Sequence, residues 1–328
     1  VLGSKYRVVK TEGNLNNHIG VPLSILSAGS AAEAAVWEVG MNHPGEIAPL
    51  AALIQPTCAI ITNIGTAHIE YMKTRDAIAL EKGMLAEAVP ADGAVVLPAE
   101  DDKSDSIAAR SRARVVRTGI AKGDLLATDI QSTTEGTHFT ILHLGEKIPA
   151  SIAVHGTHMV QNALLALAAG LEMGVPLEKG VKGLAKARLV GGRLEQKTIA
   201  GVTFLDDSYN ANPESMEAAL NTLHLVPGSG RRIAVLGKMG ELGDHAAEGY
   251  HRVGQAAARL ADILFTVGAE ASSISAAARE SGLGRIHEVE DTAAAARMLS
   301  QLARPGDLVL VKGSRSARME TLFEHLRN

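Results

Sequence analysis

The chain has 328 residues, 46% hydrophobic and 21% charged, so it is too long for one ordinary hydrophobic core and too apolar to be disordered. Its 32 basic and 36 acidic residues give a net charge of −4, which excludes a chain-wide basic footprint for nucleic acid or anionic membrane. Aromatic residues make up only 3%, the single cysteine excludes an internal disulfide, and no apolar run reaches the roughly 18 residues of a membrane span. We expect a cytoplasmic protein with two or more domains, without membrane insertion or nucleic-acid binding.

Short apolar strands alternate along the chain with alanine-rich helices, a pattern typical of parallel sheets covered by helices. The strands that we predict are Ala35–Val39, Cys58–Thr62, Gly93–Leu97, Arg114–Thr118, Thr137–Leu144, Val202–Leu205, Arg231–Leu236, Ile263–Val267 and Leu308–Val311. Few helices interrupt residues 92–154, which predicts a β-rich subregion there. A helix follows over Met159–Glu172, and the alternation restarts after Gly191 and Gly192. We place a domain boundary between residues 191 and 192.

Polar loops follow the first strands, where open α/β sheets bind their ligands. The loop at residues 11–22 is rich in asparagine, which either holds a ligand or simply forms turns. Glu38 ends an apparently buried strand, where a carboxylate is unfavourable unless a cation or a hydrogen-bond donor partners it. His68 lies in the glycine turn after the next strand, and Lys82 follows it further along the chain. Spacing alone leaves a structural and a functional role open for both residues.

Two aspartates, Asp206 and Asp207, follow a strand in the second half of the chain. Asn212 and Pro213, just beyond them, predict the N-cap and the first residue of a helix. The cap does not account for the aspartates, one of which could accept the hydroxyl groups of a ribose. The sequence therefore leaves a turn and a nucleotide site as alternatives.

Two further turns carry glycine and positive charge. The turn Leu236–Gly243 contains Lys238, and residues 312–316 present Lys312 and Arg315 beside backbone donors, as an anion site would. Solvated surface charges are the alternative. The pattern G-x-x-x-x-G-K-[ST], the usual cradle for nucleotide phosphates, does not occur in the sequence.

Five motifs in a fixed order resemble those of the Mur ligase family of peptidoglycan synthesis: T-E-G-N-x-N-N-x-I-G-V-P, G-M-N-H-P-G-E-I, I-T-N-I-G-x-A-H, D-D-S-Y-N-A-N-P and M-G-E-L-G. The resemblance covers essentially the whole chain. It implies an α/β protein with a central parallel-sheet ATPase domain at residues 1–191, incomplete and with a β-rich subregion, and a C-terminal Rossmann-like domain at residues 192–328. The family's N-terminal uridine-nucleotide domain and its P-loop segment are expected to be missing.

The resemblance also implies residues for ATP and metal binding. Glu38 and His68 resemble the magnesium ligands, and Lys82 falls at a carbamylated lysine whose carboxylate helps to hold the second of two ions. The remaining implied contacts to ATP are Asn162 to adenine, Arg193 to the phosphates and Asp207 to the ribose.

Further residues match the family's substrate contacts. The resemblance implies contacts to the nucleotide-peptide substrate from Asn14, Asn16 and Asn17, and contacts near the incoming dipeptide from Lys312, Ser314 and Arg315. Lys238 departs from the family pattern L-G-D-M-G-E-L-G, which has aspartate at this position.

The implied activity is ATP-dependent joining of D-alanyl-D-alanine to UDP-N-acetylmuramoyl-tripeptide through an acyl phosphate, with Glu38, His68 and Lys82 as the catalytic group. We expect a monomer that uses ATP and magnesium. One alternative is another amide ligase of the same superfamily, such as a folylpolyglutamate synthetase. A second is a catalytically inactive nucleotide-binding remnant, because the P-loop is absent, and a third is a scaffolding protein.

Overall fold

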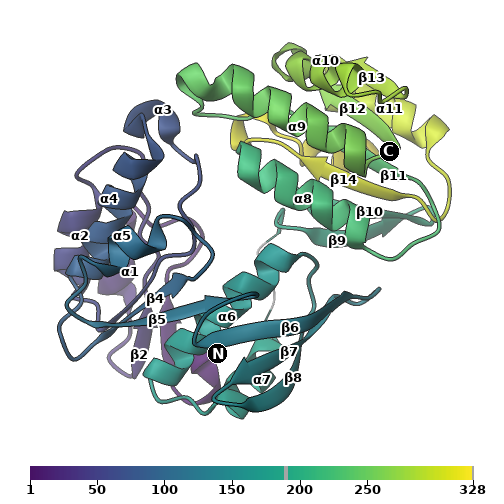
Figure 1. Cartoon of the computed structure of the whole chain (residues 1–328). Helices are drawn as coiled ribbons and strands as arrows, with labels where there is room; N and C mark the ends of the chain where they lie inside the picture. Colours follow the sequence, from purple (N-terminus) through teal and green to yellow (C-terminus); the bar gives the residue numbers. More distant parts are fainter. Residues whose placement is uncertain (188–190, 327–328) are drawn as a thin grey trace. The chain divides into compact units, whose positions relative to one another are not determined.

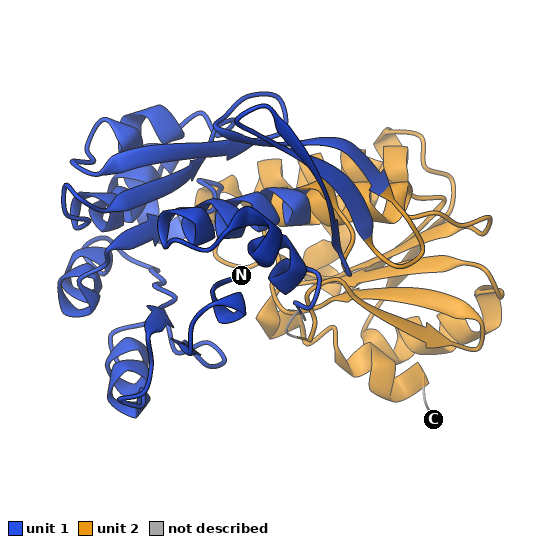
Figure 2. Ribbon diagram, turned by 90° about the horizontal axis from the view of Figure 1, so that it is seen from below, with its two compact units in different colours: residues 1–131, 137–153, 158–187 blue, residues 132–136, 154–157, 188–328 orange. Residues whose placement is uncertain are grey.

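The computed structural model describes residues 1–187 and 191–326, which fall into two compact units. Unit 1 comprises Val1–Gln131, Thr137–Ala153 and His158–Ala187. Unit 2 comprises Ser132–Gly136, Val154–Thr157 and Arg188–Asn328. Figure 2 distinguishes the two units by colour. The chain thus passes between the units more than once.

Unit 1 contains two sheets. The small sheet pairs β1 (Val8–Lys10) with β2 (Ala34–Val36) in parallel. The large sheet has the order β3-β4-β5-β6-β7-β8, with the strands Cys58–Ile60, Ala94–Pro98, Arg114–Gly119, Leu125–Ser132, Thr137–His143 and Glu146–Ile152. Its first four strands pair in parallel, and β7 and β8 form an antiparallel pair. Because β3 and β4 are parallel, the loops that follow them lie at the same edge.

Helices cover this sheet and complete the hydrophobic core of unit 1. They are α1 (Gly20–Ser27), α2 (Ile47–Ile54), α3 (Ile69–Met72), α4 (Arg75–Glu87), α5 (Ser104–Ala108), α6 (Thr157–Glu172) and α7 (Leu177–Leu184). One core cluster joins Ile78 of α4 and Ile107 of α5 to Val95 and Leu97 of β4. All four side chains are at most 1% exposed, so burial of apolar surface fixes α4 against the sheet.

Unit 2 is built on a six-stranded sheet of order β13-β12-β11-β14-β10-β9 (Figure 1). In chain order, β9 to β14 span Glu195–Ile199, Val202–Asp207, Arg232–Leu236, Ile263–Val267, Ile286–Val289 and Leu308–Lys312. All pairings are parallel except that of β9 with β10. The loops after β10, β11, β12 and β14 therefore share one edge of the sheet.

Helices lie on both faces of this sheet, as in a doubly wound fold. They are α8 (Pro213–Leu225), α9 (Ala246–Leu260), α10 (Ser272–Glu280), α11 (Thr292–Leu302) and α12 (Thr321–Leu326). Leu299 of α11 and Phe323 of α12 pack against Val235, Phe265 and Val309 of the strands. In Figure 1, α8 and α9 run side by side along the sheet.

The predicted α/β class with parallel-dominated sheets is confirmed, and so is the β-rich subregion, which corresponds to β4–β8. The predicted strand Ala35–Val39 is too long, because β2 ends at Val36. Strands β6, β8, β9 and β13 were not predicted. No helix in the described ranges is long and apolar enough to cross a membrane.

Candidate functional site

The loops after β1 and β2 meet through Asn16 and Glu38. The Asn16 amide donates to Glu38 Oε1 at 2.8 Å, and the Glu38 backbone N–H donates to Thr11 Oγ1 at 2.9 Å. Glu38 is exposed and lies beyond the end of β2, so the prediction that it ends a buried strand is wrong. Its carboxylate has a hydrogen-bond donor as partner and is exposed, which removes the cost of burial that we expected.

The three predicted asparagines occupy different positions. Asn17 Oδ1 accepts from the backbone N–H groups of Ile19 (3.1 Å) and Gly20 (2.9 Å), and so satisfies donors at the start of α1. Asn14 is exposed, and its carbonyl accepts from the Asn16 N–H at 2.8 Å. The structure therefore brings only Asn16 into contact with the Glu38 carboxylate, while Asn17 has a capping role.

Lys82 of α4 reaches the loop after β3. Its Nζ donates to the carbonyl of Asn63 at 2.8 Å. Burial lowers the pKa of Lys82, and the nearby charge of Asp101 opposes this shift. A lowered pKa increases the fraction of neutral amine, which is the form that reacts with carbon dioxide to give a carbamate.

His68 closes the same loop with an unusual backbone. Its φ is +64°, in the left-handed region, and it is the N-cap of α3. Residues other than glycine adopt this region rarely, and such strained positions cluster at functional sites. Nine non-glycine residues in the described ranges have a positive φ, so this backbone by itself assigns no role to His68.

The predicted metal ligands do not form a complete metal site. In the described part of the chain, no group of three or more His, Cys, Asp or Glu side chains could hold a metal ion. Glu38 and His68 offer two metal-ligating groups. A third group from this set requires a carboxylate on Lys82. By its chemistry, this set of groups suits a divalent cation only in the carbamylated form, since an ammonium group repels a cation and has no lone pair to offer.

The predicted adenine contact, Asn162, is an exposed residue of α6. Its amide nitrogen lies 3.9 Å from the Met159 sulfur, a weak local contact. Its exposure leaves the amide accessible to a ligand.

In unit 2, Asp207 and Lys312 form a pair at the carboxyl ends of neighbouring strands. Lys312 Nζ donates to Asp207 Oδ2 at 2.5 Å and to the Asn210 carbonyl at 2.9 Å. Lys312 is only 3% exposed, so a carboxylate partner is what makes its charge tolerable there. The sequence assigned these two residues to different substrates, and the structure joins them. Asp207 Oδ1 also accepts from the N–H of Leu194, the residue before β9, at 3.2 Å.

The other predicted residues of unit 2 surround this pair in sequence but differ in exposure. The Arg193 guanidinium stacks over the Tyr209 ring, 4.4 Å from its centroid, and is exposed. Ser314 is 3% exposed, and its Oγ lies 3.1 Å from Ser316 Oγ. Arg315 points into solvent and pairs with Glu320 at 3.1 Å. Ser314 is thus a structural part of the turn, whereas Arg193 and Arg315 are accessible.

Two family models match the chain. The Mur ligase middle domain matches residues 1–170, and the Mur ligase glutamate ligase domain matches residues 192–315. The chain belongs to the Mur ligase family. Both matches agree with the α/β architecture of the two units.

Two curated Mur ligases similar to the chain share one name. The UDP-N-acetylmuramoyl-tripeptide–D-alanyl-D-alanine ligase of Bacillus subtilis is 36% identical, and the match covers 99% of this chain and 71% of the relative. The ligase of the same name from Escherichia coli is 35% identical, over 97% of this chain and 70% of the relative.

Solved Mur ligase structures agree with the fold over nearly the whole chain. A MurF crystal structure from Acinetobacter baumannii superposes with a TM-score of 0.91 at 35% identity, over 99% of this chain and 72% of that one. MurF from Thermotoga maritima in complex with ADP gives 0.90 at 26% identity, over 99% of this chain and 74% of that one.

The departure at Lys238 from the Mur ligase pattern has a structural counterpart. Lys238 Nζ lies 2.8 Å from Glu270 Oε1, in the short helical turn after β12. The Lys238 carbonyl accepts from the Ser314 N–H at 2.8 Å, so the turns after β11, β12 and β14 are linked. The positive charge at position 238 is therefore compensated by a carboxylate on a neighbouring turn.

Sequence reasoning missed one residue that supports the Mur ligase loops, Glu81. It is 7% exposed, and its carboxylate accepts from the N–H groups of Gly45 (2.8 Å) and Ile47 (2.7 Å). Glu81 thereby fixes the end of the G-M-N-H-P-G-E-I motif and the start of α2. The available signal was a carboxylate one turn after Ile78, within the buried face of α4.

Proposed function

We propose that the chain carries the ATPase and ligase domains of a UDP-N-acetylmuramoyl-tripeptide:D-alanyl-D-alanine ligase. The observation that carries this proposal is that the two relatives of this name from Bacillus subtilis and Escherichia coli are 35–36% identical over at least 97% of the chain. The domain boundary that we propose lies between residues 191 and 192, where the second family model begins. We place the reaction in the cytoplasm, where ATP and nucleotide-linked precursors are available, and expect a monomer.

The reaction proposed is amide formation driven by ATP. The terminal carboxylate of the tripeptide attacks the γ-phosphorus of ATP, forming an acyl phosphate and releasing ADP. The amine of D-alanyl-D-alanine then attacks the acyl carbon, and inorganic phosphate leaves. Phosphoryl transfer requires little covalent chemistry from the protein and depends on positioning and charge neutralisation.

Magnesium would supply that charge neutralisation when bound, with Glu38, His68 and carbamylated Lys82 as its proposed ligands. Two features of the chain support these assignments: the lowered pKa of Lys82, and the hydrogen bond from Lys82 Nζ to the Asn63 carbonyl in the loop that carries His68. Asn16 orients the Glu38 carboxylate through its amide, and Asn14 and Asn17 belong to the same substrate-facing loop.

For ATP we propose Asn162 at adenine, Asp207 at the ribose and Arg193 at the phosphates. The exposed guanidinium of Arg193 supports its role, since stacking on Tyr209 holds it in place while its N–H groups remain available. For the dipeptide we propose Arg315, with Lys312 and Ser314 shaping the turn. Lys312 acts through Asp207 in this arrangement, because its own charge is engaged there.

Phosphate release tests the proposal. The 328-residue chain, alone and fused to the part of the Bacillus subtilis relative that it does not match, is given ATP, Mg²⁺, UDP-N-acetylmuramoyl-tripeptide and D-alanyl-D-alanine. We expect release that needs all four components in at least the fused form. Release that does not depend on the dipeptide would contradict the proposal, and no release in either form would favour a nucleotide-binding remnant.

Lys82→Ala is the first variant to test in the active form. It removes the proposed carbamate, so we expect turnover to fall by about 100-fold or more, the range typical of a lost catalytic group. The matched control is Lys179→Ala, an exposed lysine of α7. Full activity of Lys82→Ala would exclude the carbamate role.

A further inference from the structure

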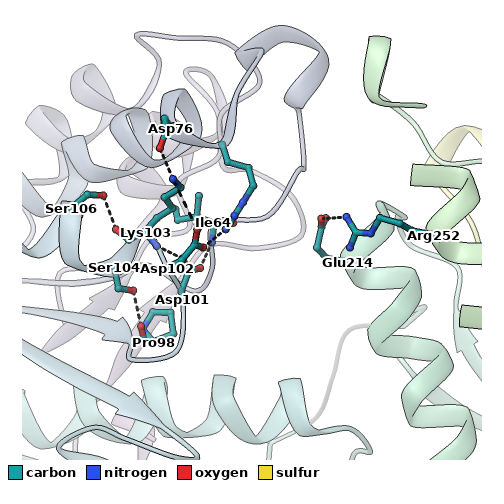
Figure 3. Close-up of polar contacts among 11 residues, drawn as sticks. Ile64, Asp76, Pro98, Asp101, Asp102, Lys103, Ser104, Ser106, Glu214 and Arg252 are labelled. Carbon is teal, nitrogen blue, oxygen red and sulfur yellow. Dashed lines mark hydrogen bonds and ion pairs between the residues drawn. The ribbon is translucent and has the colours of Figure 1, made fainter. Parts of the chain in front are cut away.

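Both backbone polar groups of Ile64, in the loop after β3, are held by charged side chains (Figure 3). Its N–H donates to Asp101 Oδ2 at 2.7 Å. Its carbonyl accepts from Arg75 Nε at 3.0 Å and from Arg75 Nη2 at 2.8 Å. Hydrogen bonds to charged groups are the stronger kind, so the position of this peptide is tightly specified.

The two side chains that hold Ile64 are themselves fixed. Arg75 forms a bidentate pair with Asp102, through Nη2–Oδ1 at 2.5 Å and Nη1–Oδ2 at 3.1 Å. Asp101 Oδ1 accepts from the Lys103 N–H at 2.9 Å, which orients its carboxylate. Lys103 in turn pairs with Asp76 at 2.5 Å. The first turn of α4 is therefore tied twice to the loop after β4.

The parallel pairing of β3 with β4 explains why these groups meet. Cys58, Ala59 and Ile60 pair with Ala94, Val95 and Val96, so the loops that follow both strands leave the same edge of the sheet. Residues 101–103 of the second loop thus lie beside Ile64 of the first.

The loop held in this way contacts one candidate catalytic residue and carries another. Asn63, directly before Ile64, provides the carbonyl to which Lys82 donates at 2.8 Å. His68, four residues after Ile64, ends the loop in its left-handed conformation. A displacement of the Ile64 peptide would therefore change the position of both residues.

We propose that Arg75 and Asp101 are positioning residues of the ligase site, holding Ile64 so that His68 and Lys82 keep the geometry needed to bind a divalent cation. The inference rests on the proposed function, because it takes His68 and Lys82 as metal ligands. Neither Arg75 nor Asp101 is required to touch substrate. Mutation of residues that orient metal ligands without contacting the metal commonly lowers metal affinity by about 10–100-fold.

Two measurements on the 328-residue chain test this inference. Hydrogen exchange of the Ile64 amide reports how firmly Asp101 and Arg75 hold the Ile64 peptide. Mn²⁺ titration followed by electron paramagnetic resonance reports the affinity for a divalent cation. Asp101→Ala removes the acceptor of the Ile64 N–H, so we expect exchange about tenfold faster or more and Mn²⁺ affinity about tenfold weaker. Asp101→Asn leaves one carbonyl oxygen for the two N–H groups of Ile64 and Lys103, so Ile64 exchange should lie between the rates of Asp101→Ala and of the original chain.

Arg75→Lys is a second variant. It keeps the positive charge but lacks the guanidinium group that donates to the Ile64 carbonyl and to Asp102. It should weaken Mn²⁺ binding, whereas Arg279→Lys, at an exposed pair with Glu288 in unit 2, should not.

Unchanged Ile64 exchange in Asp101→Ala would show that Asp101 does not hold the Ile64 peptide in place, and would overturn the inference. Faster exchange with unchanged Mn²⁺ affinity would overturn the positioning role. A parent chain without Mn²⁺ binding in bicarbonate buffer would overturn the metal site of the proposed function, and with it this inference.

Discussion

At the scale of single residues, Asp307 makes the most informative buried ion pair. It is 3% exposed, and its carboxylate accepts from the Arg231 guanidinium at 2.5 Å and from the Arg304 and Arg231 N–H groups at 2.8 and 2.9 Å. Burial alone would raise the pKa of Asp307, but these donors outweigh it and lower the pKa. The pair stabilises the start of β14 against the start of β11.

Asp307→Asn should lower the free energy of unfolding by about 2 kcal/mol at neutral pH, because Arg231 loses its counter-charge. A carboxyl group whose pKa is lowered by folding stabilises the fold at pH values above its pKa in the unfolded chain, which is about 3.9. This contribution is lost as the pH falls further. The difference between the two proteins should thus be constant from pH 5 to 7 and shrink below about pH 4. Urea unfolding at several pH values measures it, with Asp105→Asn, at an exposed pair with Arg117, as control. A difference that grows at low pH would contradict this account.

At the scale of elements, the start of α8 depends on a cap that the sequence already predicted. Asn212 Oδ1 accepts from the Ser215 N–H at 2.8 Å, and Ser215 Oγ accepts from the Asn212 N–H at 3.0 Å. Asn212→Ala should cost about 1 kcal/mol in urea unfolding. Asn221→Ala, in the same helix but exposed, should cost nothing, because alanine is the better helix former. Equal effects of the two substitutions would exclude a specific capping contribution.

The linked turns after β11 and β12 give a charge-exchange prediction. Lys238→Asp restores the usual family residue but places it beside Glu270, so we expect about 0.5–1 kcal/mol of destabilisation from like charges. Adding Glu270→Lys should recover most of that loss. A double-mutant cycle in urea measures the coupling, and a coupling near zero would mean that Glu270 does not compensate the charge at position 238.

Strand prediction succeeded best for strands that are buried on both faces. Ile263–Val267 is buried at every position and reads as a continuous apolar run, so its bounds were predicted correctly. β6 and β8 were missed because neither is a continuous apolar run. Leu125–Ser132 is buried only at Leu125 and Ala127, and Glu146–Ile152 contains Pro149 and two charges. Their pairing, rather than their composition, makes them strands.

At the scale of the whole molecule, the proposed boundary predicts an independently folding fragment. Residues 192–328 contain all six strands of the unit 2 sheet, so we expect cooperative thermal unfolding by circular dichroism. The fragment lacks His155, which is 3% exposed and lies 3.3 Å from Gln196 Oε1, so it should unfold at a lower temperature than unit 2 does in the full chain. A fragment without a cooperative transition would show that the boundary is misplaced.

The site illustrates the limit of sequence reasoning at this scale. Motifs named Lys82, Asp207 and Lys312 individually, but nothing in the sequence pairs Asp207 with a lysine 105 positions away. The same holds for Arg75 and Asp102, which are separated by 27 residues. Such pairs form because parallel strands bring their carboxyl ends to one edge of the sheet. Local composition does not predict strand order, so it does not predict these pairs.

The most direct test of the central claim is the mass of the nucleotide product. The fused chain is incubated with ATP, Mg²⁺, UDP-N-acetylmuramoyl-tripeptide and an equimolar mixture of D-alanyl-D-alanine, D-alanine and L-glutamate. We predict one dominant product whose mass rises by the dipeptide less one water. Preferential addition of a single amino acid would contradict the account and assign the chain to a different amide ligase of the same family.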